Sequence, residues 1–253
     1  MRVRVYGKRL KSCICKIGEA RRSALGAEHP DTLTSMNNLA VIYTNRGRLK
    51  EAENLETQVI EARTRVLGTE HPSTLTSLGN LASMYRSQGR WKEAEELEMQ
   101  AMSTFERVLG ADHPSTLTSI ANLASTFRNP GRWMEAEELE ARVLQTRTRA
   151  LGQEYPSTLT SMCNLASVFC DLGRWKEAEA LEVQVLETRK RVLGQKHPDT
   201  LLSMANLVST YHQQGRLTEA KKIEVEVLAI RKRCWERGNP TRLAAWRASR
   251  RQG

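Results

Sequence analysis

The chain has 253 residues, of which 40% are hydrophobic and 27% charged, and this balance predicts a folded, soluble protein. No run approaches the roughly 18 apolar residues of a membrane span, and the first residues lack the apolar stretch of a secretory signal, so we expect a cytoplasmic protein without a membrane partner. The five cysteines are scattered and fit neither a disulfide framework nor a CxxC metal pair.

The formal net charge of +10 is concentrated at the two ends of the chain. Residues 1–26 carry eight Lys or Arg and one Glu, and residues 235–253 carry five Arg and one Glu. The segment between them holds 26 basic and 27 acidic residues and is nearly neutral. A nucleic acid would have to bind the ends alone, and we do not expect one as the partner.

A 42-residue repeat fills the neutral segment. Leu-Gly recurs at 25, 67, 109, 151 and 193, and His-Pro follows at 29, 71, 113 and 197, with Tyr155-Pro156 as the variant. Asn-Leu recurs at 38, 80, 122, 164 and 206, and Gly-Arg at 47, 89, 131, 173 and 215. The chain therefore divides into an off-pattern basic segment (residues 1–26), five repeats (27–234) and an off-pattern basic tail (235–253).

Each repeat predicts two amphipathic helices. In the first repeat, apolar residues from Leu33 to Tyr43 recur at helical spacing and predict helix A, which ends before Gly47. The pattern from Leu49 to Val66 predicts helix B. We expect helix A to be capped by the residue that follows each proline, namely Asp31, Ser73, Ser115, Ser157 and Asp199.

The short turn between helices A and B predicts antiparallel pairs that stack along the chain. Such stacking gives an all-α fold, a right-handed superhelical solenoid with helix A on its inner surface. Small residues such as Ala40 and Ala52 allow close approach of the helices. We expect Tyr43 and the three tryptophans that begin helix B to fill the space between pairs, these being Trp91, Trp133 and Trp175.

Residues 27–234 resemble the tetratricopeptide repeat, with Leu39, Ala40, Tyr43, Gly47 and Ala52 at the expected offsets. The 42-residue length, the LGxEHPxTL loop and the NLAxxY motif are similar to the kinesin light chain type of this repeat. GRWKEAEELE is similar to the repeats of fungal NACHT or NB-ARC signalling ATPases. The resemblance implies a non-catalytic protein–protein interaction scaffold that binds extended peptides in a groove lined by helix A.

Two alternatives stay open beside the scaffold. One is a relative of kinesin light chains that acts as a cargo adaptor, although the sequence shows no heptad coiled coil before the repeats. The other is a detached sensor or oligomerisation arm of a signalling ATPase, although no GxxxxGK[ST] phosphate loop is present.

Both basic ends can be interpreted as repeats translated in a shifted frame. With suitable codons, residues 234–247 give LGKGQPDTLGSMA, the start of a sixth repeat, and residues 6–16 give RKEAEELHMQ, a remnant of a helix B. The chain would then be a fragment or a frame-shifted version of a longer repeat protein. The alternative is a pair of unrelated basic tails.

The sequence shows no catalytic constellation, and we expect no enzyme activity, small-molecule substrate, cofactor or metal. The histidines at 29, 71, 113 and 197 recur on successive loops, which favours a role in the loop over metal binding. Cys163 and Cys170 lie two turns apart on one predicted helix and are too far apart to bond. The Glu runs EAEELE are predicted to lie on the exposed face of helix B.

The candidate peptide-binding residues form an asparagine column in the middle of helix A, and they are Asn38, Asn80, Asn122, Asn164 and Asn206. Asparagine is a mediocre helix former, so its recurrence indicates a role for the side chain. The resemblance implies that its amide binds the main chain of an extended peptide. The alternative is that each asparagine bonds to the adjacent repeat.

Positions that vary between repeats are expected to set specificity. One such column consists of Asn37, Gly79, Ala121, Cys163 and Ala205. Arg86 and Arg128 occupy equivalent places in adjacent repeats and could pair with a carboxylate, so the peptide could be acidic. The alternative is that both arginines are solvated charges at a helix end.

Overall fold

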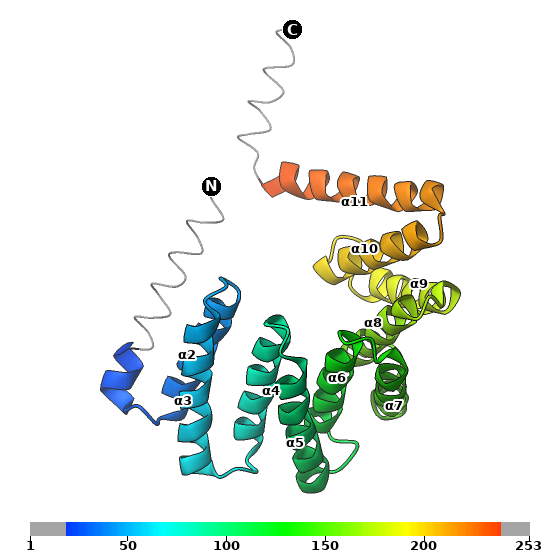
Figure 1. Cartoon of the computed structure of the whole chain (residues 1–253). Coiled ribbons are helices and arrows are strands. Elements are labelled where there is room, and N and C mark those ends of the chain that lie inside the picture. Colours follow the sequence, from blue (N-terminus) through cyan, green and yellow to red (C-terminus); the bar gives the residue numbers. More distant parts are fainter. Residues whose placement is uncertain (1–18, 239–253) are drawn as a thin grey trace, which may run out of the picture. The chain divides into compact units, whose positions relative to one another are not determined.

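The computed structural model describes residues 19–238, with side chains up to residue 232. Every regular element in this range is an α-helix, as predicted (Figure 1). The shifted-frame interpretation concerns residues 6–16 and 234–247, whose side chains lie outside the described part of the structure.

The helices alternate between the predicted A and B positions. Helix A is represented by α2 (Pro30–Thr44), α4 (Pro72–Ser87), α6 (Pro114–Arg128), α8 (Pro156–Asp171) and α10 (Pro198–Gln213). Helix B is represented by α3 (Leu49–Leu67), α5 (Trp91–Leu109), α7 (Trp133–Leu151), α9 (Trp175–Val192) and α11 (Leu217–Gly238). A helix α1, described over residues 19–25, precedes them.

Successive helices pack as antiparallel pairs, which confirms the predicted repeat fold. Within repeats, α2 packs on α3, α4 on α5, α8 on α9 and α10 on α11 (Figure 1). Between repeats, α3 contacts α4, α5 contacts α6, and α9 contacts α10. The chain divides into two compact units, Met1–Leu139 and Glu140–Gly253, and the boundary falls inside α7.

A Gly-Arg pair fixes the turn from helix A to helix B. Gly89 has φ 77°, a conformation that only glycine adopts readily, and it ends α4. The Arg90 guanidinium lies 3.8 Å from the centroid of the Tyr85 ring and donates to Glu93 in the first turn of α5. It also donates at 3.0 Å to Glu53 of the preceding repeat. The stacked arginine recurs in the other four repeats, at Arg48, Arg132, Arg174 and Arg216.

Helix A is capped by histidine, and the predicted capping by the residue after proline is wrong. The proline occupies the first helical position, so the cap is the residue before it. In α4 the Nδ1 atom of His71 accepts from the backbone N–H of Ser73 at 3.1 Å. His29, His113 and His197 do the same in α2, α6 and α10. The predicted loop role of the histidines is therefore confirmed, whereas Tyr155 makes no such bond.

The core consists of small and aliphatic residues, and the tryptophans lie at its edge. Ala40, Ala52 and Ala94 are fully buried, as their small size predicts. Trp133 is 40% exposed and its Nε1 donates to the backbone carbonyl of Arg128 at 3.1 Å. The prediction that the tryptophans fill the space between pairs is thus wrong for Trp133, whose ring lies beside the turn from α6, whereas Trp91 and Trp175 are half-buried.

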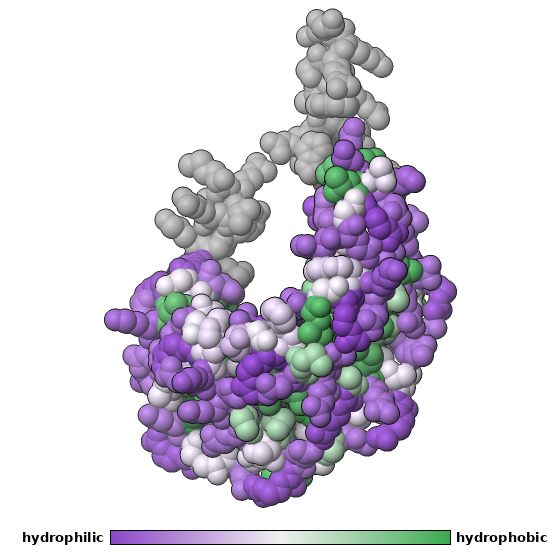
Figure 2. All heavy atoms as spheres, turned by 45° about the vertical axis from the view of Figure 1, so that its right-hand side comes forward, coloured by the Kyte–Doolittle hydropathy of each residue, from purple (hydrophilic) through white to green (hydrophobic). Residues whose placement is uncertain are grey.

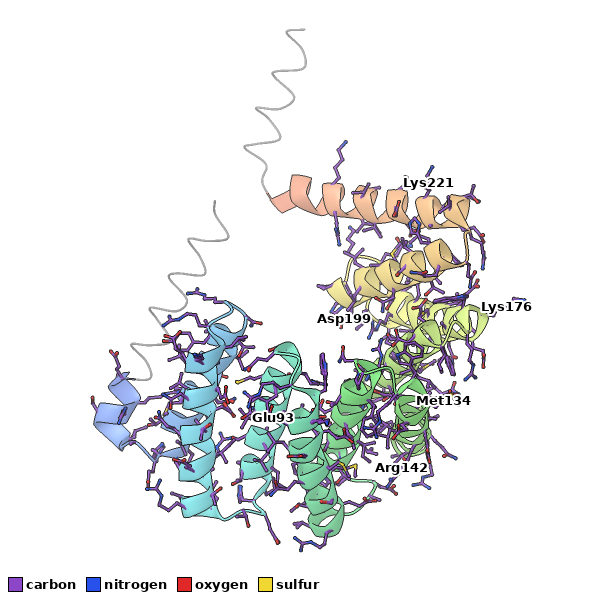
Figure 3. All side chains as sticks on the ribbon, viewed as in Figure 1. Glu93, Met134, Arg142, Lys176, Asp199 and Lys221 are labelled. Carbon is purple, nitrogen blue, oxygen red and sulfur yellow. The ribbon has the colours of Figure 1, made fainter. Side chains whose placement is uncertain are left out.

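The face shown in Figure 2 is mainly hydrophilic, with small scattered groups of hydrophobic residues. Lys176 and Lys221 project outward from the first turns of α9 and α11 (Figure 3). Over residues 19–238, no helix has the length and apolar character of a membrane span.

Candidate functional site

A column of buried glutamates lies on helix B, and the prediction that the Glu runs are exposed is wrong for their last member. The buried residues recur every 42 positions and are Glu56, Glu98, Glu140 and Glu182. Glu98 is 1% exposed, while Glu96 of the same run is exposed. The fifth copy, Glu224 on the last described helix, is exposed. Each buried carboxylate must find hydrogen-bond donors, because burying an unpaired charge is costly.

Helix A of the following repeat donates a hydrogen bond to each of these carboxylates, and the donor alternates between two kinds of residue along the chain. Asn80 and Ser77 donate to Glu56, and Asn164 Nδ2 donates to Glu140 Oε1 at 3.1 Å. The other two carboxylates accept from a threonine that lies one helical turn after the asparagine. These bonds join Thr126 to Glu98 and Thr210 to Glu182.

The asparagine column therefore has two environments. Asn80 and Asn164 bond to the preceding repeat, which is the arrangement that the structural alternative predicts. Asn122 and Asn206 are half-buried and Asn38 is exposed. Among the described residues, no hydrogen-bond partner is present for the side-chain amides of these three. Their amides remain accessible on the surface of helix A.

Burial raises the pKa of the glutamates. The pKa of Glu56 is raised to about 7 by the loss of hydration, although Arg63, Asn80 and Ser77 favour its charged form. Burial also raises the pKa of Glu98 and Glu182. In both cases the loss of hydration outweighs the threonine hydrogen bond, which acts in the opposite direction on the pKa.

A second column places an arginine two helical turns after the buried glutamate. In α3, Arg63 Nη1 donates to the Ser73 carbonyl at 2.8 Å and to Ser77 Oγ at 2.7 Å. The equivalent arginines make the same two bonds in other repeats, and they are Arg21, Arg147 and Arg189. This column was not predicted from the sequence, although its 42-residue spacing was a usable signal. The copy in α5 is Phe105.

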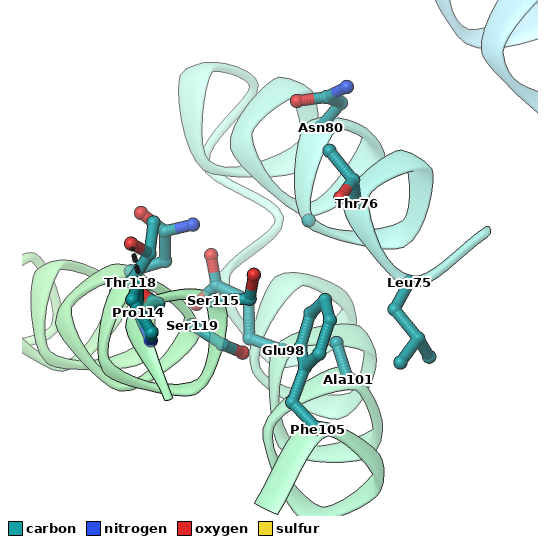
Figure 4. Close-up of a pocket in the computed structure, with 12 residues that line it drawn as sticks. Leu75, Thr76, Asn80, Glu98, Ala101, Phe105, Pro114, Ser115, Thr118 and Ser119 are labelled. Atoms are coloured by element: carbon teal, nitrogen blue, oxygen red, sulfur yellow. Dashed lines mark hydrogen bonds between the residues drawn. The ribbon is translucent and has the colours of Figure 1, made fainter. Parts of the chain in front are cut away.

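A cavity of about 320 Å³ lies between α4, α5 and α6 (Figure 4). Its lining includes Gly79 on α4, Glu98 and Phe105 on α5, and Ser119 and Asn122 on α6. The cavity thus joins one buried carboxylate to one accessible asparagine of the predicted column.

The two predicted arginines are both engaged. Arg86 Nη1 donates to the backbone carbonyl of Asn122 at 3.1 Å and lies 3.9 Å from Glu98 Oε1. Its side chain is 19% exposed, so it is not a solvated helix-end charge. Arg128 is half-buried and also interacts within the chain. Over the described side chains, no cluster of His, Cys, Asp and Glu could hold a metal ion.

Comparison with known proteins identifies the repeats. Tetratricopeptide repeat family models match residues 32–73 and 74–115, and also residues 130–190 and 157–233. No curated protein matches the chain significantly.

Solved structures with similar folds include two from Podosopora anserina, described as a kinesin light chain with nearly identical TPR-like repeats. Both are 34% identical to this chain. The alignment with the first covers 82% of this chain and 98% of that structure, with a TM-score of 0.69. The alignment with the second covers 81% of this chain and 98% of that structure, with a TM-score of 0.67. BtubC (BKLC) from P. vanneervenii is 20% identical, covers 90% of this chain and 92% of its own, and has a TM-score of 0.72. At this lower identity the similarity concerns the fold.

Proposed function

Because this chain belongs to the tetratricopeptide repeat family, whose repeats serve as protein-interaction scaffolds, we propose that it binds extended peptide segments along the helix A face. Its role is binding and involves no catalysis. The alternatives of a cargo adaptor or a detached arm of a signalling ATPase differ in the partner, and they use the same scaffold.

The observation that carries this proposal is the division of the asparagine column. A carboxamide can donate to a peptide carbonyl and accept from a peptide N–H at the same time, so it can bind a main chain of any sequence. Asn80 and Asn164 use this capacity within the fold. Asn122 and Asn206 do not, because Thr126 and Thr210 satisfy the neighbouring glutamates in their place. Together with the exposed Asn38, these two asparagines give three amides of the column that a ligand can bind.

The prediction of an acidic peptide assumed that Arg86 and Arg128 are available to pair with its carboxylates. Arg86 is held by Asn122 and lies near Glu98, so pairing it with a ligand carboxylate would cost these contacts. The proposal therefore does not require an acidic peptide. We expect an affinity near the micromolar range, on the order of −8 kcal/mol, because ordering a flexible peptide offsets much of the gain from its contacts.

Selection of 12-residue peptides from a random displayed library on the immobilised full chain tests the proposal. The dissociation constant of a selected synthetic peptide is then measured by calorimetry for the wild type and for Asn122→Ala and Asn206→Ala. We expect Asn122→Ala to weaken about tenfold the peptides that bind the first compact unit, and Asn206→Ala to weaken about tenfold those that bind the second, in line with the loss of a hydrogen-bonding group. Asn54→Ala on α3 is the matched control and should bind as the wild type does. Failure to select any peptide, or binding that all three variants retain, would refute the proposal.

A further inference from the structure

The second repeat differs from the others at the place where a buried glutamate meets an arginine. In the first repeat, the charge of Arg63 favours the ionised form of Glu56, and Arg147 acts on Glu140 in the same way in the third. The equivalent of these arginines after Glu98 is Phe105, which carries no charge. Glu98 is therefore buried without the cation that its counterparts have on their own helix.

A second difference removes a side chain that would otherwise donate to the buried glutamate. In the first repeat, the Asn37 amide, turned with its nitrogen toward Glu56, donates to the two carboxylate oxygens at 2.8 and 3.0 Å. Its equivalent beside Glu98 is Gly79, which has no side chain. The cavity between α4, α5 and α6 lies where these two changes coincide.

Polar groups of the cavity are left without partners. Glu98 Oε1 is buried and accepts no hydrogen bond from any described residue, and the nearest cationic atom is Arg86 Nη1 at 3.9 Å. In the other repeats the serine equivalent to Ser119 accepts from the buried arginine, as Ser77 does from Arg63 at 2.7 Å. Ser119 has no arginine to accept from, because Phe105 stands in its place. Thr76 and Thr118 line the cavity and are exposed, so it reaches the surface.

We infer that this cavity binds the guanidinium group of an arginine side chain carried by a bound peptide, an inference that rests on the proposed function. The guanidinium would donate to Glu98 Oε1 and Ser119 Oγ, and so would supply from outside the cation that other repeats supply from helix B. Guanidinium is suited to this site because its planar donors match a carboxylate and its face stacks on an aromatic ring such as Phe105. The chain already uses such stacking between Arg90 and Tyr85.

The arginines at the equivalent position of other repeats indicate which ligand group fits the cavity. Four copies of this position hold an arginine that donates to a serine hydroxyl and a backbone carbonyl of the next helix A. An acidic side chain would be repelled by the carboxylate of Glu98, and an apolar one would leave Glu98 Oε1 without a hydrogen bond. Asn122, which lines the same cavity, is placed to bind the main chain beside the arginine.

The test uses the full chain and two short probes, acetyl-Gly-Gly-Arg-Gly-Gly-amide and its citrulline counterpart, which has nearly the same shape but no charge. Binding is followed by the backbone amide resonances of Gly79 and Ser119. We expect the arginine peptide to shift these resonances and to bind at least tenfold more tightly than the citrulline peptide. Equal binding of the two peptides would contradict the inference.

Two variants separate the pocket from the rest of the face. Glu98→Gln removes the charge with little change of shape, and Phe105→Arg supplies an internal cation of the kind that the other repeats tolerate. Each should weaken the arginine peptide at least tenfold. Glu140→Gln, in a repeat that has its own arginine, is the matched control and should leave binding unchanged. Urea denaturation of each variant establishes that it is folded.

The failures of the two proposals can be told apart. If a library-selected peptide loses affinity on Asn122→Ala but neither it nor the arginine probe responds to Glu98→Gln or Phe105→Arg, the pocket inference is wrong and the peptide-binding face stands. If no peptide binds the wild type, both proposals are wrong.

Discussion

At the scale of the residue, the hydrogen bonds of the buried glutamate determine whether the neighbouring asparagine side chain is accessible to a ligand. Asn164 donates to Glu140, whereas Asn122 is left accessible because Thr126 donates to Glu98. The sequence predicted the asparagine column, but it did not show which asparagines bond within the fold and which stay accessible. The residue is the same in all five repeats, and the glutamate that it can contact is on another helix. The threonine one turn later was a signal, and its meaning depends on packing between repeats.

Substitution of the two asparagines should therefore have different effects on stability. Asn164→Ala removes a donor from a buried carboxylate and should lower the free energy of unfolding by about 1–3 kcal/mol. Asn122→Ala removes no internal bond of the side chain and should change it by less than about 0.5 kcal/mol. Urea denaturation followed by circular dichroism measures both. Equal losses would show that Asn122 is structural.

The neighbouring core residue gives a reference for the cost of lost packing. Leu123 is 3% exposed, so Leu123→Ala should leave a cavity and cost about 2–5 kcal/mol. The same urea titration measures this cost. A loss no larger than that of Asn122→Ala would mean that α6 does not pack as described.

The raised pKa of Glu56 predicts a dependence of stability on pH. Its pKa is about 7 in the folded chain, against a usual value of 4.5, so between these values the folded chain retains a proton that the unfolded chain has released. The free energy of unfolding should therefore fall as the pH rises from about 4.5 to about 7, with a contribution from Glu56 on the order of 3 kcal/mol. Glu56→Gln removes this contribution, so urea denaturation at pH 5 and pH 8 should show a smaller difference in the variant. The same difference in both proteins would contradict the assignment.

At the scale of the element, periodicity predicted every helix pair, and the helix ends were harder to predict. Apolar spacing defines α2 to α11 because each helix buries one stripe against its neighbours. The predicted caps lie two residues after the observed ones, because the prediction did not place proline at the first helical position. The burial of Glu98 was missed because the charge pattern of helix B is continuous, while the contact that buries one of its glutamates comes from the next repeat.

The histidine caps lead to a prediction on a matched pair of helices. His113 caps α6 through Nδ1, whereas Tyr155 at the equivalent place in α8 makes no cap bond. His113→Ala should destabilise the chain by about 0.5–2 kcal/mol, and Tyr155→His should stabilise it by up to about 1 kcal/mol. Thermal unfolding monitored at 222 nm measures both changes. Opposite signs are required; a loss of stability in both variants would contradict the capping role.

At the scale of the whole molecule, the repeats share one fold but differ in which polar side chains lack a hydrogen-bond partner within the chain. The repeat architecture followed from the 42-residue period, which is a property of the sequence alone. The cavity beside Glu98 did not, because it arises where two unrelated changes, Gly79 and Phe105, meet across α4 and α5. We therefore expect the face formed by α4 and α6 to dominate peptide binding.

The most direct test of the central claim is residue-resolved NMR of the full chain titrated with a library-selected peptide. We predict that the largest changes in amide and side-chain carboxamide signals fall on α4, on α6 and on the α5 residues that line the cavity, with the Asn122 carboxamide among them. The signals of exposed α3 residues such as Asn54 and Glu61 should stay unchanged. Perturbations confined to helix B, with the Asn122 and Asn206 carboxamides unaffected at saturation, would contradict it.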